Sequence, residues 1–133
     1  MSSSEIAATP LGELLGIQVV RADPGEVRAR LAWRPDLCTL EGILHGGTLM
    51  ALADTAGALC AFLNLPSGAS TSTIESKTNF FRAVRGGEVE AVSRPLHAGR
   101  MTIVVQSDVY DSEQRRVAQV TQTQAVLSPR RPG

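Results

Sequence analysis

The sequence predicts an α+β fold in which an antiparallel sheet of five or six strands wraps around one long central helix. Two observations lead to this prediction. Short segments of alternating apolar and polar residues precede and follow one long apolar segment at 47–64, and turns that contain glycine separate most of them. This segregation is typical of α+β proteins. The chain of 133 residues suits a single domain over 1–133, ordered at about 11–127 and followed by a disordered tail at 128–133.

The elements before the long segment carry clear local signals. Thr9-Pro10 is typical of a helix start, with threonine as N-cap and proline at the first helical position, and Gly16 ends that short helix. From residue 26 to residue 33 apolar and charged residues alternate, which indicates one packed and one solvated face. The expected order is a helix at 10–15, strands at 17–23 and 26–33 around the Pro24-Gly25 turn, and a connecting loop at 34–44.

Four strands are expected after the long segment. The first of them is polar on both faces, unlike the others. One face of the third consists of Met101, Ile103, Val105, Ser107 and Val109. We expect these strands at 71–81, 88–97, 100–110 and 115–127, joined by tight turns at Gly86-Gly87, Ala98-Gly99 and 111–114, with the last strand closing the sheet.

The long segment itself is almost free of charge. Between Glu41 and Glu75 there is one charged residue, Asp54, where a chain with 20% charged residues would hold about six or seven. A helix that is apolar on every side is a buried helix. It falls short of the roughly 20 residues of a membrane span and carries a central acid, so we expect no membrane contact.

A carboxylate on a buried helix needs an explanation, because an unpaired buried charge is costly. In one interpretation Asp54 is structural and bonds to backbone amides or to an arginine. In the other it faces a cleft as a nucleophile or general base. Its helical neighbours Ala51, Gly57 and Ala58 are small and leave space beside it, which favours the second interpretation.

The long helix begins at His45-Gly46-Gly47. Two glycines at a helix start can expose free N–H groups at the positive end of the helix dipole, where they suit an oxyanion or a polarised carbonyl. An ordinary glycine turn would have the same sequence. His45 could act as a base, but an imidazole that holds the turn by backbone hydrogen bonds is the favoured interpretation.

Gly46 and Asp54 are too far apart to act together within one chain. Eight residues of helix separate them, about 12 Å at 1.5 Å per residue. Reacting groups must approach to about 3–3.5 Å. If both act on one functional group, they come from two chains, and the protein is at least a dimer.

Composition excludes several classes of function. The 13 basic and 13 acidic residues give a net charge of zero, which argues against a nucleic-acid partner. The first ten residues lack the charged and apolar regions of a signal peptide, and Cys38 and Cys60 form no disulfide framework, so we expect reduced thiols and a cytoplasmic protein. With His45 and His97 as the only imidazoles, 52 positions apart, no metal site is expected.

Three segments resemble a known family. They are HGGTLMALADTA at 45–56, KTNFFRAVRGG at 77–87 and PLHAGR at 95–100. Together they resemble the hot-dog-fold acyl-CoA thioesterases, in particular the PaaI-like branch of the 4-hydroxybenzoyl-CoA thioesterase superfamily, over roughly residues 11–127. The resemblance implies a helix wrapped by an antiparallel sheet, a homodimer with two shared sites and often a homotetramer. It implies no cofactor, since CoA is part of the substrate.

The resemblance also implies roles for individual residues. The Gly46 amide would polarise the thioester carbonyl, and Asp54 of the opposite subunit would be nucleophile or general base. Many relatives carry Asn or Gln where this chain has Thr39. Some carry Ser or Thr where it has Ala58, and the hydroxyl of that residue holds water. Other relatives take the water-holding hydroxyl from the strand after the helix, where Ser72 stands, although Ser72 could equally be one more polar residue of a polar run.

For binding of substrate and CoA, the resemblance points to the helix start and to the strand edges and turns after the helix. Arginines suit phosphate through charge-assisted hydrogen bonds, although such residues are also common on any solvated surface. The candidates are Gly47, Thr39, Arg82, Arg85, His97, Gly99 and Arg100.

The expected function is hydrolysis of an aryl- or medium-chain acyl-CoA to the free acid and CoA. A hot-dog dehydratase is a second possibility, but the paired histidine and acid of that reaction are not evident. A non-catalytic acyl-CoA-binding module is a third. A lone acid beside small residues favours the enzyme over the binding module.

Overall fold

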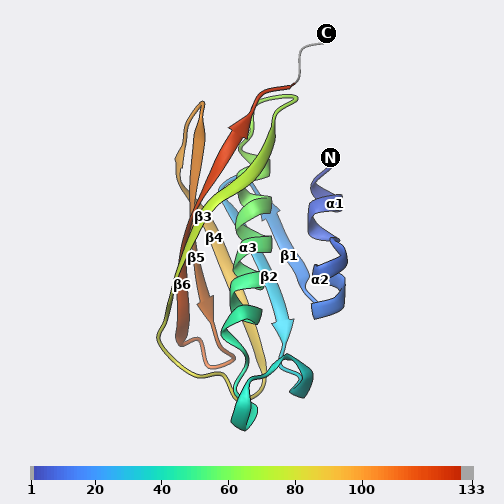
Figure 1. Cartoon of the computed structure of the whole chain (residues 1–133), viewed down its shortest axis with the longest axis vertical. Helices are drawn as coiled ribbons and strands as arrows, with labels where there is room; N and C mark the ends of the chain where they lie inside the picture. The colour runs from blue at the N-terminus through green and yellow to red at the C-terminus, as the bar shows by residue number, and fades with distance from the viewer. Residues whose placement is uncertain (1, 130–133) are drawn as a thin grey trace.

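The computed structural model describes residues 2–129, and residues 130–133 of the expected tail lie outside the described residues. One long helix lies against a curved antiparallel sheet of six strands, and two short helices flank it near the N-terminus (Figure 1). The α+β prediction is therefore confirmed. The elements are α1 (Ser3–Ala7), α2 (Pro10–Leu15), β1 (Gln18–Asp23), β2 (Glu26–Ala32), α3 (Gly46–Leu63), β3 (Ser70–Phe80), β4 (Glu88–Ala98), β5 (Thr102–Tyr110) and β6 (Arg116–Leu127).

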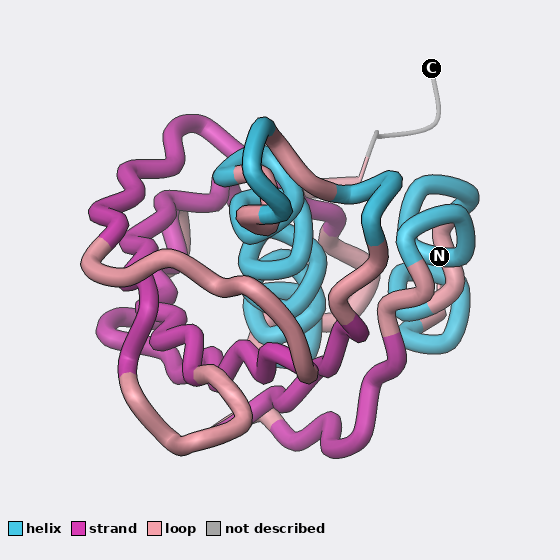
Figure 2. Tube along the Cα trace, turned by 90° about the horizontal axis from the view of Figure 1, so that it is seen from below, coloured by secondary structure: helices cyan, strands magenta, loops and turns pink. Residues whose placement is uncertain are grey.

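The strand order in the sheet is β1-β2-β4-β5-β6-β3. The expectation of tight turns throughout is wrong at one place, because residues 81–87 cross over from β3 at one edge to β4 in the middle. The last strand does not close the sheet, since β3 pairs with β6 and forms the edge. Seen along the helix axis, the sheet curves around α3 on two sides and the N-terminal helices lie on a third (Figure 2).

The N-terminal region contains one helix that was expected and one that was not. The α2 helix starts where predicted, because Thr9 accepts a hydrogen bond from the Gly12 amide at 3.1 Å, and Gly16 ends it with a φ of 77°. The α1 helix was not predicted. Its start is a capping box in which Ser2 and Glu5 bond to each other's backbone amides.

The core forms between α3 and the inner face of the sheet. On β2, Val27, Ala29 and Leu31 are buried as the alternation predicted. On β5 the inward face is also confirmed, with one exception. Met101 is 81% exposed, because the strand begins one residue later and Met101 lies in the turn before it.

The α3 helix is not buried on every side, which corrects the expectation from its composition. One face packs against the sheet, while Met50, Asp54 and Gly47 are exposed. By length and hydropathy alone α3 could cross a membrane, but half of it is buried here and it contacts all six strands, as the core helix of a soluble protein does. The composition therefore reflects a core helix with one face that this chain leaves uncovered.

Both cysteines are free thiols. Cys60 lies on the buried side of α3 and Cys38 is half-buried in the loop before it. Burial raises the pKa of the Cys60 thiol to about 11. The Cys60 thiol therefore stays protonated and unreactive at neutral pH.

A network of ion pairs covers the outer face of the sheet around Glu26. This side chain is only 10% exposed and receives hydrogen bonds from Arg21, Arg28 and Arg94. The hydrogen bonds from Arg28 and Arg94 lower the pKa of Glu26 from 4.5 to about 2, against the opposing effect of desolvation.

Because its pKa is depressed in the folded state, Glu26 contributes stability above its ordinary pKa of 4.5, and this contribution is lost as the pH falls from 4.5 toward 2. We expect Glu26→Gln to lower the free energy of unfolding at pH 7 and to flatten its pH dependence between 4.5 and 2. Urea unfolding at pH 7, 4 and 2.5 measures both effects. Glu13→Gln, on the exposed surface of α2, is the control, and an equally steep dependence in the Glu26 variant would contradict the prediction.

Candidate active site

The start of α3 leaves one backbone amide free. His45 is the N-cap, and its Nδ1 accepts a hydrogen bond from the Gly47 amide at 2.8 Å. The amides of Thr48 and Leu49 both donate to the His45 carbonyl. The Gly46 amide has no partner among the described residues. His45 thus holds the turn by backbone hydrogen bonds, and the positive end of the helix dipole presents the Gly46 N–H.

Both glycines are required for space and not for an unusual backbone conformation, since neither has a positive φ. A Cβ atom at Gly46 would lie 3.0 Å from the Phe80 ring, and one at Gly47 would lie 2.9 Å from Nδ1 of His45. The Phe80 ring therefore covers Gly46, and the His45 ring folds back over Gly47. These two rings explain the glycine pair.

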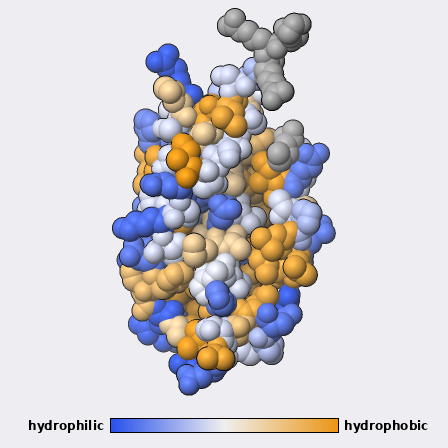
Figure 3. Space-filling view, viewed as in Figure 1, coloured by the Kyte–Doolittle hydropathy of each residue, from blue (hydrophilic) through white to orange (hydrophobic). Residues whose placement is uncertain are grey.

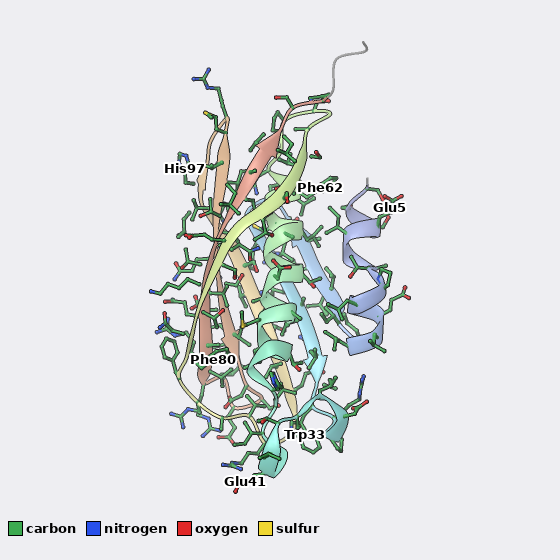
Figure 4. The ribbon with its side chains drawn as sticks, viewed as in Figure 1. Glu5, Trp33, Glu41, Phe62, Phe80 and His97 are labelled. Atoms are coloured by element: carbon green, nitrogen blue, oxygen red, sulfur yellow. The ribbon has the colours of Figure 1, made fainter. Side chains whose placement is uncertain are left out.

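A pocket of about 400 Å³ opens in front of Gly46, and it contains two other expected site residues, Thr39 and Arg82. Phe80 forms one wall of this pocket and lies in the lower half of the molecule in Figure 4. A second cavity, of about 550 Å³, adjoins it through Arg82 and contains Arg85. The helix start, the Thr39 loop and two of the candidate arginines therefore meet at one end of the molecule.

Asp54 lies two turns further along α3 and is exposed, so the expectation of a buried carboxylate is wrong for the single chain. Its Oδ1 accepts hydrogen bonds from Nε2 of Gln122 at 3.1 Å and from the hydroxyl of Thr73 at 3.4 Å. Its Oδ2 has no partner in the described part of the chain. The space expected beside Gly57 is filled by the Gln122 amide. One carboxylate oxygen is thus fixed and the other is open to solvent.

The hydroxyl nearest to Asp54 belongs to Thr73. Ser72, the residue singled out from the sequence, makes no hydrogen bond to Asp54 in this chain. Ser72 instead lines a pocket of about 290 Å³ together with Ala58, Phe62 and Ile6. Figure 4 shows Phe62 on the half of α3 that lies away from Phe80. This largely apolar pocket continues along α3 from Asp54 toward its C-terminal end.

The remaining candidates lie at the opposite end of the molecule from Gly46. His97 and Arg100 are exposed near the turn between β4 and β5, and Gly99 lies in that turn against the His97 ring. In Figure 4 His97 and Phe80 are far apart along the length of the sheet. A single chain does not bring these residues together with Thr39, Arg82 and Arg85.

Four residues of the site were not predicted from the sequence: Thr73, Phe80, Gln122 and Gln124. Gln122 and Gln124 occupy inward positions of β6 and are almost completely buried. A strand that places amide side chains where the alternation requires apolar ones is a signal for a polar site, and the sequence contains it.

One chain supplies the parts of a site for an activated carbonyl but does not complete it. The Gly46 amide can donate to a carbonyl oxygen, and the open Oδ2 of Asp54 can attack a carbon atom or accept a proton. Two helical turns, about 12 Å, keep the two groups apart on α3. In residues 2–129, no group of three His, Cys, Asp or Glu side chains could hold a metal ion.

Comparisons with known proteins agree with this chemistry. Residues 41–118 match the family model described as the thioesterase superfamily. The proofreading thioesterase EntH of Cronobacter turicensis is 31% identical over 130 residues, 96% of this chain and 95% of the relative. The 1,4-dihydroxy-2-naphthoyl-CoA hydrolase of Escherichia coli is 31% identical over 86 residues, 65% of this chain and 63% of the relative.

A solved structure extends the likeness to three dimensions. A single-residue variant of the phenylacetic acid degradation protein PaaI from Thermus thermophilus superimposes with a TM-score of 0.82 at 32% identity, over 90% of this chain and 100% of the other. The match to the family model includes both Gly46 and Asp54. Sequence and fold therefore point to the same group of proteins.

Proposed function

This chain belongs to the thioesterase superfamily, and from that membership we propose that it hydrolyses an acyl-CoA thioester to the free acid and CoA. The observation that carries the proposal is a pair of unpartnered groups on one helix. These are the N–H of Gly46, at the positive end of α3, and Oδ2 of Asp54. The first suits a carbonyl oxygen that gains negative charge, and the second suits a nucleophile or general base.

The proposed reaction adds water across the C–S bond. The Gly46 amide donates to the carbonyl oxygen and stabilises the charge that develops there. As a general base, Asp54 takes a proton from water as it attacks the carbon. As a nucleophile, it forms an anhydride that water then opens. In both routes the C–S bond breaks, the thiolate of CoA gains a proton, and Asp54 returns to the carboxylate.

We propose that two chains build each site. The face of one chain that carries α3 and β3 would pack against the same face of the other chain. The β3 strand is an 11-residue edge strand whose outer side is unpaired by described residues, an arrangement that invites pairing with another chain. Exposed apolar side chains on or beside this strand are Met50, Ile74 and Phe80. Figure 3 shows apolar patches among polar groups on the face of the molecule seen in Figure 1. An isologous dimer through this face would cover them and would bring Asp54 of one chain toward Gly46 of the other. Assembly of two dimers into a tetramer stays a prediction for native mass spectrometry.

The acyl group is proposed to occupy the apolar pocket beside Asp54, which Ala58, Phe62 and Ile6 line. The volume of this pocket is about 290 Å³, near the lower end of the range of small-molecule pockets. An aryl group or a medium-length alkyl chain has this size. The Escherichia coli relative is named as the hydrolase of an aryl-CoA, 1,4-dihydroxy-2-naphthoyl-CoA.

Phosphates of CoA are proposed to bind Arg82 and Arg85 beside Gly46, with His97, Gly99 and Arg100 of a second chain as further contacts. Arg82 and Arg85 are exposed and form no ion pair with a described carboxylate. Arg85 donates only to the backbone carbonyl of Glu41, at 3.4 Å. Guanidinium groups without a carboxylate partner favour phosphate through charge-assisted hydrogen bonds. Reduced thiols and an acyl-CoA substrate suit a cytoplasmic location.

A panel of aryl- and alkyl-CoA esters tests the function, with release of free thiol as the measurement. We expect turnover of at least one class, with a lower kcat/KM when a short thiol carrier replaces CoA, because the nucleotide contacts are then missing. Saturable binding of these esters without thiol release would favour the acyl-CoA-binding module instead.

A further inference from the structure

Gln122 is a buried polar side chain at the base of Asp54. It lies on β6, is completely buried, and its Nε2 donates to Oδ1 of Asp54 at 3.1 Å. An amide inside an apolar core needs partners, because an unpaired buried polar atom is costly. Gln122 meets this need only in part, since its Oε1 has no hydrogen-bond partner. The structure therefore keeps an incompletely satisfied amide where an apolar residue would fit.

Gly57, one turn after Asp54 on α3, makes room for this amide. A Cβ atom at Gly57 would lie 2.7 Å from Cδ of Gln122 and closer still to Oε1. Any larger residue at this position would displace the amide. Glycine in the middle of a helix is unfavourable, so the position also sacrifices helix stability to admit Gln122.

The direction of the amide follows from the charge on Asp54. If the amide were turned over, Oε1 would face the carboxylate, and two acceptors would oppose each other. With Nε2 toward Oδ1, the amide donates a hydrogen bond to the carboxylate oxygen instead of opposing it with a second acceptor. The unpaired Oε1 is thus the consequence of a donor aimed at Asp54.

A second donor reaches the same oxygen through a chain of polar side chains. Gln124 donates through Nε2 to the Thr73 hydroxyl at 2.7 Å, and Thr73 donates to Oδ1 of Asp54. Gln124 is fixed in turn by the Thr71 hydroxyl, which lies 3.1 Å from its Oε1. Two strands, β3 and β6, therefore hold one oxygen of Asp54 and leave the other free.

We propose that Gln122 is a positioning residue for the hydrolysis and that Gly57 exists to admit it. By fixing Oδ1, Gln122 turns Oδ2 of Asp54 toward the substrate, and Oδ2 is the oxygen that attacks or accepts the proton. This inference rests on the proposed function of Asp54. It assigns the reaction to one particular oxygen atom and adds two residues, neither of which needs to touch the substrate.

Gln122→Met tests the proposal, because methionine has a similar length and no donor. We expect kcat to fall about 10-fold or more with little change in KM, since small misplacements of a reacting group are costly. The Tm is expected to stay the same or rise, because the unpaired Oε1 disappears. A merely structural residue would instead lower Tm and leave the kcat of the folded enzyme unchanged.

Gln119→Met is the matched control. Gln119 lies on the same strand, and its Nε2 donates to Oδ1 of Asp108 at 2.9 Å, on the outer side of the sheet. The same amide-to-carboxylate bond is lost there, away from the site. We expect wild-type kcat and KM for this variant, and an equal loss of kcat in both variants would overturn the proposal.

Gly57→Ala tests the contact between Gln122 and the helix from the helix side. Its methyl group should displace Gln122 and lower kcat while Asp54 and Gln122 keep their chemistry. In a Gln122→Ala background the space is empty, so the added methyl group should cause no further loss of kcat. If the double variant loses kcat by the product of the two single losses, the substitutions act independently, and Gly57 does not act through Gln122.

Asp54→Asn, measured alongside, distinguishes failure of the positioning role of Gln122 from failure of the catalytic role of Asp54. If this variant loses activity while Gln122→Met and Gly57→Ala retain the wild-type kcat, the positioning role is wrong and the proposed function stands. If Asp54→Asn is fully active, the proposed catalytic role of Asp54 fails and the positioning role fails with it, whereas a wild type that releases no thiol from any ester overturns the proposed hydrolysis itself. The side-chain amide resonances of Gln122 add a readout that needs no substrate. They should shift strongly in Asp54→Ala, and unchanged resonances would exclude the hydrogen bond.

Discussion

Asp54→Asn is expected to fold and to dimerise like the wild type and to lose thioesterase activity by about 10²-fold or more, the usual contribution of a catalytic base. The asparagine oxygen can still accept from Gln122 and Thr73, so the local packing is preserved. Its amide nitrogen then stands in the place of Oδ2, which is the atom with no partner among the described residues. A neutral amide at that place can neither attack a thioester nor take a proton from water.

The measurement is kcat/KM on the best ester of the panel, with Tm and size-exclusion chromatography to establish folding and assembly. Asp23→Asn is the matched control, because Asp23 is an exposed acid at the end of β1. It should be fully active. Near wild-type turnover in Asp54→Asn would remove Asp54 from the mechanism, whereas the acyl-CoA-binding module requires that the wild type itself release no thiol.

The elements that local signals specify were predictable from the sequence. The N-cap and C-cap of α2, the alternation on β2 and the start of the long helix at the glycine pair all lie within a residue or two of their predicted positions. The α1 helix was predictable as well, since Ser2 and Glu5 have the spacing of a capping box. Short-range chemistry determines these features, and a single sequence contains it.

Features that depend on distant partners could not be predicted in the same way. The position of β3 at the sheet edge follows from its pairing with β6 and explains why it is polar on both faces. The exposure of Asp54 depends on which face of α3 its own chain covers, and composition alone does not specify that. Gln122 beside Gly57 is a contact across 65 positions of sequence, visible beforehand only as a polar residue in an apolar register.

The shared site gives the second large effect. Gly46→Val should be nearly inactive, because its side chain would collide with the Phe80 ring, 3.0 Å from the position of a Cβ, and disturb the amide that polarises the carbonyl. Asp54→Asn should be nearly inactive for the separate reason given above. If each site takes Gly46 from one chain and Asp54 from the other, the two inactive variants should restore each other's activity when they are mixed.

The expected recovery follows from counting. Random pairing of the two variants at equal ratio makes half of the dimers mixed, and each mixed dimer has one intact site of two, so about a quarter of the wild-type activity should return. Subunit exchange is established by mass spectrometry of isotopically labelled chains, and either variant refolded alone is the control. Exchange without recovery would place Gly46 and Asp54 in one protomer or assign one of them the wrong role. Because about 12 Å of helix separates the two residues, recovery is the outcome that the geometry of α3 requires if both groups act on one thioester.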